Sequence, residues 1–154
     1  MVDSQGIWRL PGVTLPSVLE GLHEPAVILN ESRRIVAANH AYREHFAEGD
    51  HVCGRHCHEV SHHFSIPCDQ LGEICPLLGA RATGVHCPAL HIHHTSEGEQ
   101  HEAVTVYPLY DSNGRIRFYL EVLSHQEIAS LESSRKGRMV GRSSAFTGML
   151  ELIT

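Results

Sequence analysis

Apolar and polar positions alternate in short blocks over the first third of the chain. Two compact apolar segments, Ala26 to Asn30 and Ile35 to Asn39, flank the polar turn ESRR and predict the strands of a β-hairpin. Leu15 to Pro25 is amphipathic and ends in proline, which predicts a short helix before the hairpin. The segment HAYREHFAE predicts a helix after it, with Asn39 as its N-cap.

The second half of the domain reads as a helix followed by three strands. CPLLGARATG predicts a helix that starts near Pro76 and ends at Gly84. The strands are expected at Ala89 to Thr95, His101 to Tyr110 and Arg115 to Ser124, and DSNG between the last two is a strong hairpin signal. Together these elements predict an α+β fold built on one five-stranded antiparallel sheet.

The pattern of apolar and polar residues changes at Gln126. The following residues are polar with sparse apolar positions, as in an exposed helix that finds its partner in another chain. GRSSAFTGMLELIT then restarts as a helix, capped by Ser143 or Ser144. The chain contains no internal repeat.

Composition excludes several classes of protein. With 42% hydrophobic and 19% charged residues among 154, the chain is globular rather than disordered. The formal net charge of −6, without a Lys/Arg cluster, argues against direct nucleic-acid binding. No apolar run approaches the roughly 20 residues of a membrane helix, and the N-terminus does not resemble a signal peptide. We therefore expect a cytoplasmic protein whose thiols stay reduced, and five cysteines make a disulfide framework the weaker explanation.

The segment CGRHCHEVSHHFSIPCDQLGEICPL concentrates the candidate chemistry. It carries Cys53, Cys57, Cys68 and Cys75, and Cys87 follows. Thiolates bind soft and borderline metals, but these spacings match neither a compact zinc knuckle nor a ferredoxin run. Ligands spread along an irregular loop suit an iron–sulfur cluster, and zinc stays open. Two metal-free interpretations also remain: inert buried cysteines, or a thiol switch in which Cys68 and Cys75 form a disulfide on oxidation.

Histidines fall into two groups. His56, His58, His62 and His63 share the cysteine segment, whereas His91, His93, His94 and His101 lie on predicted strands. By the alternation of a strand, His91 and His93 face one side and His94 the other, so the first two could meet the loop and complete a mixed Cys/His ligand set. For each histidine other than His62, a solvated or hydrogen-bonded side chain is the default expectation. No arrangement supports nucleophilic catalysis, so the chain is not expected to be an enzyme.

The order of these elements resembles PAS sensor domains. LHEPAVILNESRRIVAANHAYREHF resembles their opening hairpin and helix, where Asn39 and Ala41 match an N-x-A element. VYPLYDSNGRIRFYLEVLSH resembles their closing hairpin through Pro108, Asp111 and Gly114. The resemblance implies a PAS domain over residues 14–124 with helices on one face of the sheet, an extension at 1–13, a signalling helix at 125–139, and a homodimer formed through the flanking helices.

The tail resembles the first residues of the AAA+ domain of sigma-54-dependent transcription activators. Gly141, Ser143 and Leu150 of MVGRSSAFTGMLELI match that pattern, and residues 140–154 would be its start. The phosphate-binding loop G-x-x-x-x-G-K-[ST] is absent from the chain. AFTG also resembles the sigma-54-contacting GAFTGA loop, but it stands before the position of the phosphate loop instead of after it. The resemblance implies downstream AAA+ and DNA-binding domains as partners.

The central segment resembles a cysteine-rich subgroup of these PAS domains, which carry the pattern G-x-x-C-Y-E-x-x-H…P-C…C-P-L. Matching residues are Gly54, Cys57, Glu59, His62, Pro67, Cys68, Cys75, Pro76 and Leu77, with His58 in place of the tyrosine. The implied ligands of an iron–sulfur cluster, 2Fe–2S or 4Fe–4S, are Cys57, Cys68 and Cys75. The fourth ligand is expected to be His62, Cys53 or Cys87, in that order.

The resemblances together predict a redox or oxygen sensor that signals to a downstream ATPase. One alternative is a zinc-stapled interaction module without a sensing role. Others are a thiol-based sensor and a PAS cavity that binds an organic ligand or haem, with the cysteines incidental.

Overall fold

A computed structural model of the chain describes residues 4, 11–46, 48 and 51–126. Most of the predicted extension (1–13), nearly all of the predicted linker helix (125–139) and the AAA+-like start (140–154) lie outside the described residues. The elements are α1 Leu15–Glu20, β1 Ala26–Leu29, β2 Ile35–Ala38, α2 His40–His45, α3 Cys57–Ser61, the 3-10 helix η1 Cys68–Leu71, α4 Pro76–Thr83, β3 Cys87–Thr95, β4 Gly98–Tyr110 and β5 Ile116–His125.

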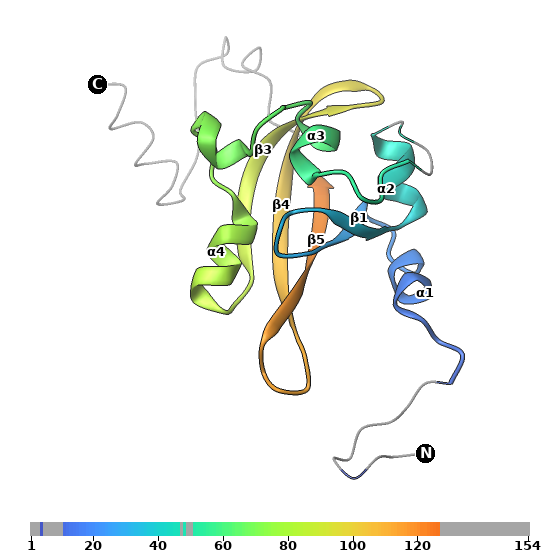
Figure 1. Ribbon diagram of the computed structural model, residues 1–154. Coiled ribbons are helices and arrows are strands. Elements are labelled where there is room, and N and C mark those ends of the chain that lie inside the picture. Colours follow the sequence, from blue (N-terminus) through green and yellow to red (C-terminus); the bar gives the residue numbers. More distant parts are fainter. Residues whose placement is uncertain (1–3, 5–10, 47, 49–50, 127–154) are drawn as a thin grey trace, which may run out of the picture.

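The five strands form one antiparallel sheet in the order β2-β1-β5-β4-β3, which confirms the predicted fold class. In Figure 1 the helices α2, α3 and α4 lie on one side of this sheet. Their apolar residues join Val27 and Leu29 of β1 in the main core. α1 is the exception to the one-sided arrangement, because its Leu19 packs with Ala26 and Ile28 in a second, smaller cluster. All four residues of β1 are buried, so both of its faces need a cover.

The turn after β2 is fixed by Asn39, the predicted N-cap of α2. Its buried Oδ1 accepts hydrogen bonds from the backbone N–H of Tyr42 (2.9 Å) and of Ala26 (3.0 Å). Its Nδ2 donates to the carbonyls of Leu19, Leu22 and Glu24. These bonds hold the segment after α1 in a non-helical path. This explains why α1 ends at Glu20, before the predicted end at Pro25.

Strands β3 and β4 begin earlier than the sequence pattern predicts. They pair from Cys87 with Val106 to Thr95 with Gly98, so the predicted loop SEGEQ contributes only a tight turn. Gly98 has φ of 102°, a left-handed conformation that suits glycine and permits this turn.

Alternation along these strands turns several polar residues toward the helices. His91 and His93 on β3, Glu102 on β4 and Glu121 on β5 are buried. They share this face with apolar residues such as Val104, and together they form the polar wall of the site described next. No helix among the described residues is long and apolar enough to cross a membrane.

Candidate metal centre

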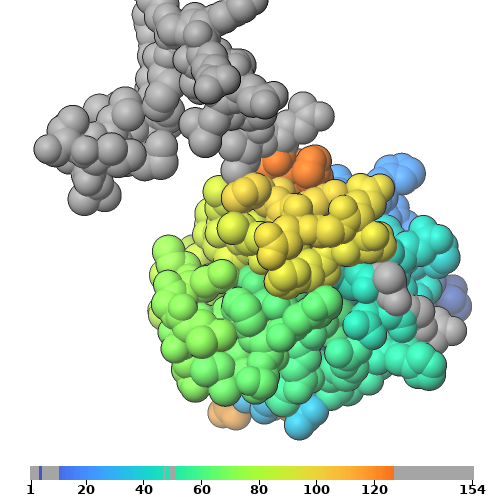
Figure 2. Space-filling model, turned by 90° about the horizontal axis from the view of Figure 1, so that it is seen from above, coloured from blue at the N-terminus to red at the C-terminus, as the bar shows by residue number. Residues whose placement is uncertain are grey.

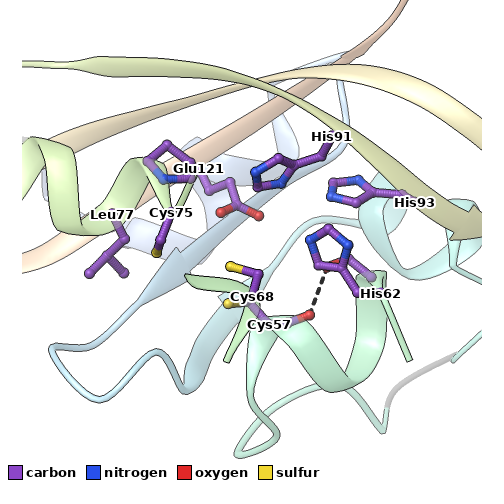
Figure 3. A pocket seen from close by; sticks show the side chains of 10 residues that line it. Cys57, His62, Cys68, Cys75, Leu77, His91, His93 and Glu121 are labelled. Atoms are coloured by element: carbon purple, nitrogen blue, oxygen red, sulfur yellow. Dashed lines mark hydrogen bonds between the residues drawn. The ribbon is translucent and has the colours of Figure 1, made fainter. Parts of the chain in front are cut away.

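One small cavity lies between the sheet and the segment that carries the cysteines. It encloses about 20 Å³, a volume that accommodates a single water-sized body. Figure 3 shows side chains from α3, the start of α4, β3 and β5 pointing into it, and Figure 2 shows the green cysteine-bearing segment packed beside the yellow β3–β4 hairpin. The lining residues are Cys57, Ser61, His62, Cys68, Cys75, Pro76, Leu77, His91, His93 and Glu121.

Three short helical segments deliver the thiols. Cys57 is the first residue of α3, Cys68 the first residue of η1, and Cys75 the N-cap of α4. The Cys57 N–H donates to the carbonyl of Arg33 in the β1–β2 turn (3.0 Å), which attaches α3 to the sheet. Gly72, with φ of 89°, ends η1 and lets the chain turn back toward Cys75. The three cysteines that the resemblance marked as ligands therefore reach the same cavity.

The thiols differ in their readiness to ionise. A hydrogen bond from the Cys68 thiol lowers the pKa of Cys75 to about 6, assisted by the backbone N–H groups of Leu78 and Leu77. The same hydrogen bond, with burial, raises the pKa of Cys68. Burial also raises the pKa of Cys57, and the Glu121 and Cys75 side chains raise it further when they are charged. At neutral pH the site thus holds one thiolate, at Cys75, with Cys68 as its hydrogen-bond donor.

Cys53 and Cys87, the other two predicted candidates for the fourth ligand, do not line this cavity. Cys53 is exposed. Cys87 is half-buried at the start of β3, and a Cβ added to Gly79 of α4 would lie 2.4 Å from the Cys87 sulfur. Cys87 therefore packs against α4, where glycine is needed to leave room for its thiol.

Three imidazoles occupy the opposite side of the cavity. His62 caps the C-terminus of α3, while His91 and His93 extend from β3, as the strand alternation predicted. One ring nitrogen of each lies within 4.8 Å of the others, and all three side chains are buried. His94 is only half-buried and stacks on His63 instead, with 5.0 Å between ring centroids.

Two of these imidazoles, His62 and His93, have lowered pKa values and so favour the neutral form. Burial, together with the neighbouring His93 and His91 rings, lowers the pKa of His62 to about 3. Burial likewise lowers the pKa of His93, outweighing the adjacent carboxylate of Glu102. Neutral imidazoles keep a lone pair on one nitrogen, which is the form that binds metals.

Glu102 lies behind His93 and was not predicted from the sequence. Its Oε2 accepts a hydrogen bond from Nδ1 of His93 (2.6 Å), and its Oε1 contacts Nε2 of His45 on α2. Burial alone would raise the pKa of Glu102, but hydrogen bonds from His45 and His93 lower it to about 2, so it is a carboxylate. Its position on the inner face of β4, among apolar residues, is the sequence signal that could have identified it.

Some buried polar side-chain atoms, one of them on His62 in the cavity wall, have no hydrogen-bond partner. Across the part of the chain that the structure describes, these atoms are Tyr42 OH, His58 Nδ1, His62 Nδ1 and Glu73 Oε2. The Glu73 oxygen lies 3.8 Å from Nδ1 of His62 and 3.9 Å from Nε2 of His91. Buried polar groups are almost always paired, so this concentration beside thiols and imidazoles indicates a binding site.

Comparison with known proteins decides the family. A family model described as PAS fold matches residues 19–125. The chain belongs to the PAS-fold family. No curated protein matches this sequence.

Solved structures agree with this PAS assignment at the level of the fold. A light–oxygen–voltage domain from a study of a flavin analogue is 16% identical, with 93% of this chain and 98% of that chain covered and a TM-score of 0.58. The PAS domain of BvgS from Bordetella pertussis is 15% identical, with 79% and 90% covered and a TM-score of 0.53. VqmA of Vibrio cholera, solved with ligand and DNA, is 20% identical, with 83% and 59% covered and a TM-score of 0.58.

Glu121 completes the wall of the PAS cavity from β5. Burial, together with the charges of Cys75 and Glu102, raises its pKa to about 8. The carboxyl group is therefore protonated at neutral pH in the metal-free domain. The donor set of thiols, neutral imidazoles and unpartnered polar atoms fits a metal ion or a metal cluster.

Proposed function

We propose that this PAS domain is a redox sensor that holds an iron–sulfur cluster, 2Fe–2S or 4Fe–4S. Cys57, Cys68 and Cys75 would supply three ligands and His62 the fourth. The observation that supports this proposal is the convergence of three thiols, from three separate segments, on a cavity that His62 also lines. Bound there, the cluster would supply one-electron redox chemistry.

The residues around the thiols suit this role. Cys75 already favours the thiolate, and Cys68 and Cys57 would lose their protons on ligation, as thiol ligands do. Leu77 and Pro76 border the site and keep water away from it. The ligands of a cluster and the exclusion of water around it both set its reduction potential. Both are therefore expected to determine the potential at which this domain signals.

The volume of the cavity argues against an organic ligand. About 20 Å³ is far below the roughly 300–1,000 Å³ of pockets for small organic molecules, so a flavin-sized group does not fit this conformation. The same volume matches one ion and makes zinc the second candidate, held by the same cysteines and His62 as a structural centre. A cluster would require the three thiol-bearing segments to move apart.

The site is connected to the route by which a signal would leave the domain. Glu121 lines the cavity, and β5 continues from it to His125, next to the segment predicted to be a signalling helix. We propose that this helix joins a homodimer and passes the signal to the AAA+ and DNA-binding domains of a cytoplasmic sigma-54-dependent activator. In this role the PAS domain is not an enzyme and does not bind nucleic acid itself.

Anaerobic purification tests the proposal. The visible absorption spectrum is recorded, and iron, acid-labile sulfide and zinc are assayed on the same sample. A brown protein with iron and sulfide, colourless as the Cys57→Ser/Cys68→Ser/Cys75→Ser variant and unchanged as Cys53→Ser, is the expected result. Stoichiometric zinc without iron would support the second candidate, and absence of both metals would overturn the proposal.

A further inference from the structure

We propose that His62, His91 and His93 form a separate binding site for one divalent ion of the zinc class, such as Zn²⁺, Co²⁺ or Fe²⁺, that needs none of the three thiols. This site does not depend on the proposed cluster. Since His62 would serve in both, cluster and ion would exclude one another in the same molecule.

The spacing of the three imidazoles suits a single ion. One nitrogen of each ring lies within 4.8 Å of the other two. Nitrogen ligands lie about 2.0–2.1 Å from zinc and therefore roughly 3.4 Å from each other in a tetrahedral site. The rings need to approach by about 1 Å or slightly more, which small side-chain rotations provide.

The hydrogen bonds of two rings leave one nitrogen of each available. Nε2 of His91 lies 2.6 Å from the carbonyl oxygen of Ile74, and a carbonyl only accepts, so Nε2 carries the N–H and Nδ1 is the nitrogen left for a metal. Nδ1 of His93 lies 2.6 Å from the Glu102 carboxylate, which places the lone pair on Nε2.

His62 provides independent evidence for a missing partner. Its side chain is 3% exposed, and its Nδ1 has no hydrogen-bond partner in the described structure. The equally unpartnered Oε2 of Glu73 lies 3.8 Å from it. That separation is too long for a hydrogen bond, and it is close to the distance between two ligands of one ion, which makes Glu73 the fourth donor of the site.

Glu102 acts as the positioning residue. Metal-binding histidines commonly donate their second N–H to a carboxylate, which fixes the orientation of the ring and makes it a stronger ligand. Glu102 makes this bond to His93 and is itself held by His45, so His93 is oriented in advance.

A cobalt titration of the full chain, carrying Cys57→Ser, Cys68→Ser and Cys75→Ser, tests the site. We expect one Co²⁺ per chain, with visible d–d absorption and without sulfur-to-cobalt charge transfer, and competition by Zn²⁺. Adding His91→Gln or His62→Ala should weaken binding by on the order of 100-fold or more. Adding Glu102→Gln should weaken it by about 10- to 100-fold.

Controls separate this site from the many other histidines. His94→Ala removes a neighbouring imidazole that faces away, and His56→Ala disrupts another group of possible ligands (His56, His58 and Glu59); both should leave the affinity within about two-fold. Circular dichroism checks that each variant is folded, and a Cys57→Ala/Cys68→Ala/Cys75→Ala background replaces the serine variant if that one fails to fold.

The outcomes distinguish the two proposals. Cobalt binding that survives His91→Gln and His62→Ala, or that is lost in His56→Ala, would overturn the histidine site whatever the anaerobic protein contains. Conversely, tight cobalt binding in the thiol-free variant, lost with His91→Gln, would support the site even if no iron–sulfur cluster is found.

Discussion

Two buried polar regions lie close together in this domain and are built on opposite principles. At Asn39, 1% exposed, the side-chain oxygen accepts two hydrogen bonds and the nitrogen donates to three carbonyls. In the Cys/His cavity, His62 Nδ1 and Glu73 Oε2 are buried without a partner. In the first region the side-chain polar atoms find their hydrogen-bond partners within the chain. In the second region a bound ligand would have to supply the missing partners.

This difference separates structural polar residues from functional ones. Asn39 makes its hydrogen bonds within the chain and acts as a determinant of the fold, because it caps α2 and holds the segment after α1. Imidazoles and carboxylates without partners reduce stability, since burial removes their water without replacing it. Such groups are retained where a ligand supplies the missing bonds, and the comparison can be tested from both sides.

The largest effect is expected from breaking the complete network. Asn39→Ala leaves two N–H groups and three carbonyls without their partner, and should lower the free energy of unfolding by about 3 kcal/mol. Chemical denaturation with far-UV circular dichroism measures it. A loss below about 1 kcal/mol would show that water replaces the side chain and that the network is not a fold determinant.

Metal binding at the Cys/His cavity should raise the free energy of unfolding by slightly less than Asn39→Ala lowers it. Zinc at 100 times its dissociation constant should stabilise the native domain by about 2.7 kcal/mol. Denaturation of the Cys57→Ser/Cys68→Ser/Cys75→Ser chain, which lacks the thiol site, is measured with zinc and with a chelator. The His91→Gln variant is the control, and equal stabilisation of that variant would contradict binding at the histidines.

Glu121 adds a pH-dependent test in chelator-treated protein. Its pKa rises from an ordinary carboxyl value to about 8 on folding. Glu121 therefore does not reduce the stability of the fold at pH 4, and the loss of stability grows as the pH rises toward 8. Glu121→Gln should therefore match the wild type near pH 4 and exceed its stability by on the order of 2 kcal/mol at pH 8. Denaturation at the two pH values measures the difference, and a pH-independent effect would mean that Glu121 is not protonated in the fold.

The smallest effect should come from a satisfied polar group in water. Asp111 Oδ1 accepts hydrogen bonds from the N–H groups of Asn113 (2.8 Å) and Arg115 (3.0 Å) in the exposed β4–β5 turn. Asp111→Ala should cost less than about 1 kcal/mol, because water can solvate both donors. A cost as large as that of Asn39→Ala in the same denaturation assay would show that hydrogen-bond count, not burial, sets the effect.

The sequence predicted the hydrogen-bond network of Asn39 better than it predicted the Cys/His cavity. Asn39 follows an apolar strand and precedes a helical pattern, so local rules were sufficient to predict its role as a cap. His91 and His93 could be placed on one face by alternation. Glu102 could have been noticed as an acidic residue on the apolar face of its strand, but its role, like those of Glu121 and Glu73, depends on what the helices bring opposite it, which no local pattern encodes. The same reason prevented exclusion of Cys53 and Cys87 from the cavity.

α2 connects the two regions, although it is only six residues long. Asn39 fixes its first turn, and His45 at its other end contacts Glu102, while the His45 carbonyl accepts the N–H of Ser96 in the β3–β4 turn (2.8 Å). The N-terminal turn of α2 is thus fixed by Asn39, and the C-terminal end of the helix contacts Glu102 through His45. A displacement of the Glu102 carboxylate would therefore act on the C-terminal end of α2 and, through the His45 carbonyl, on the β3–β4 turn.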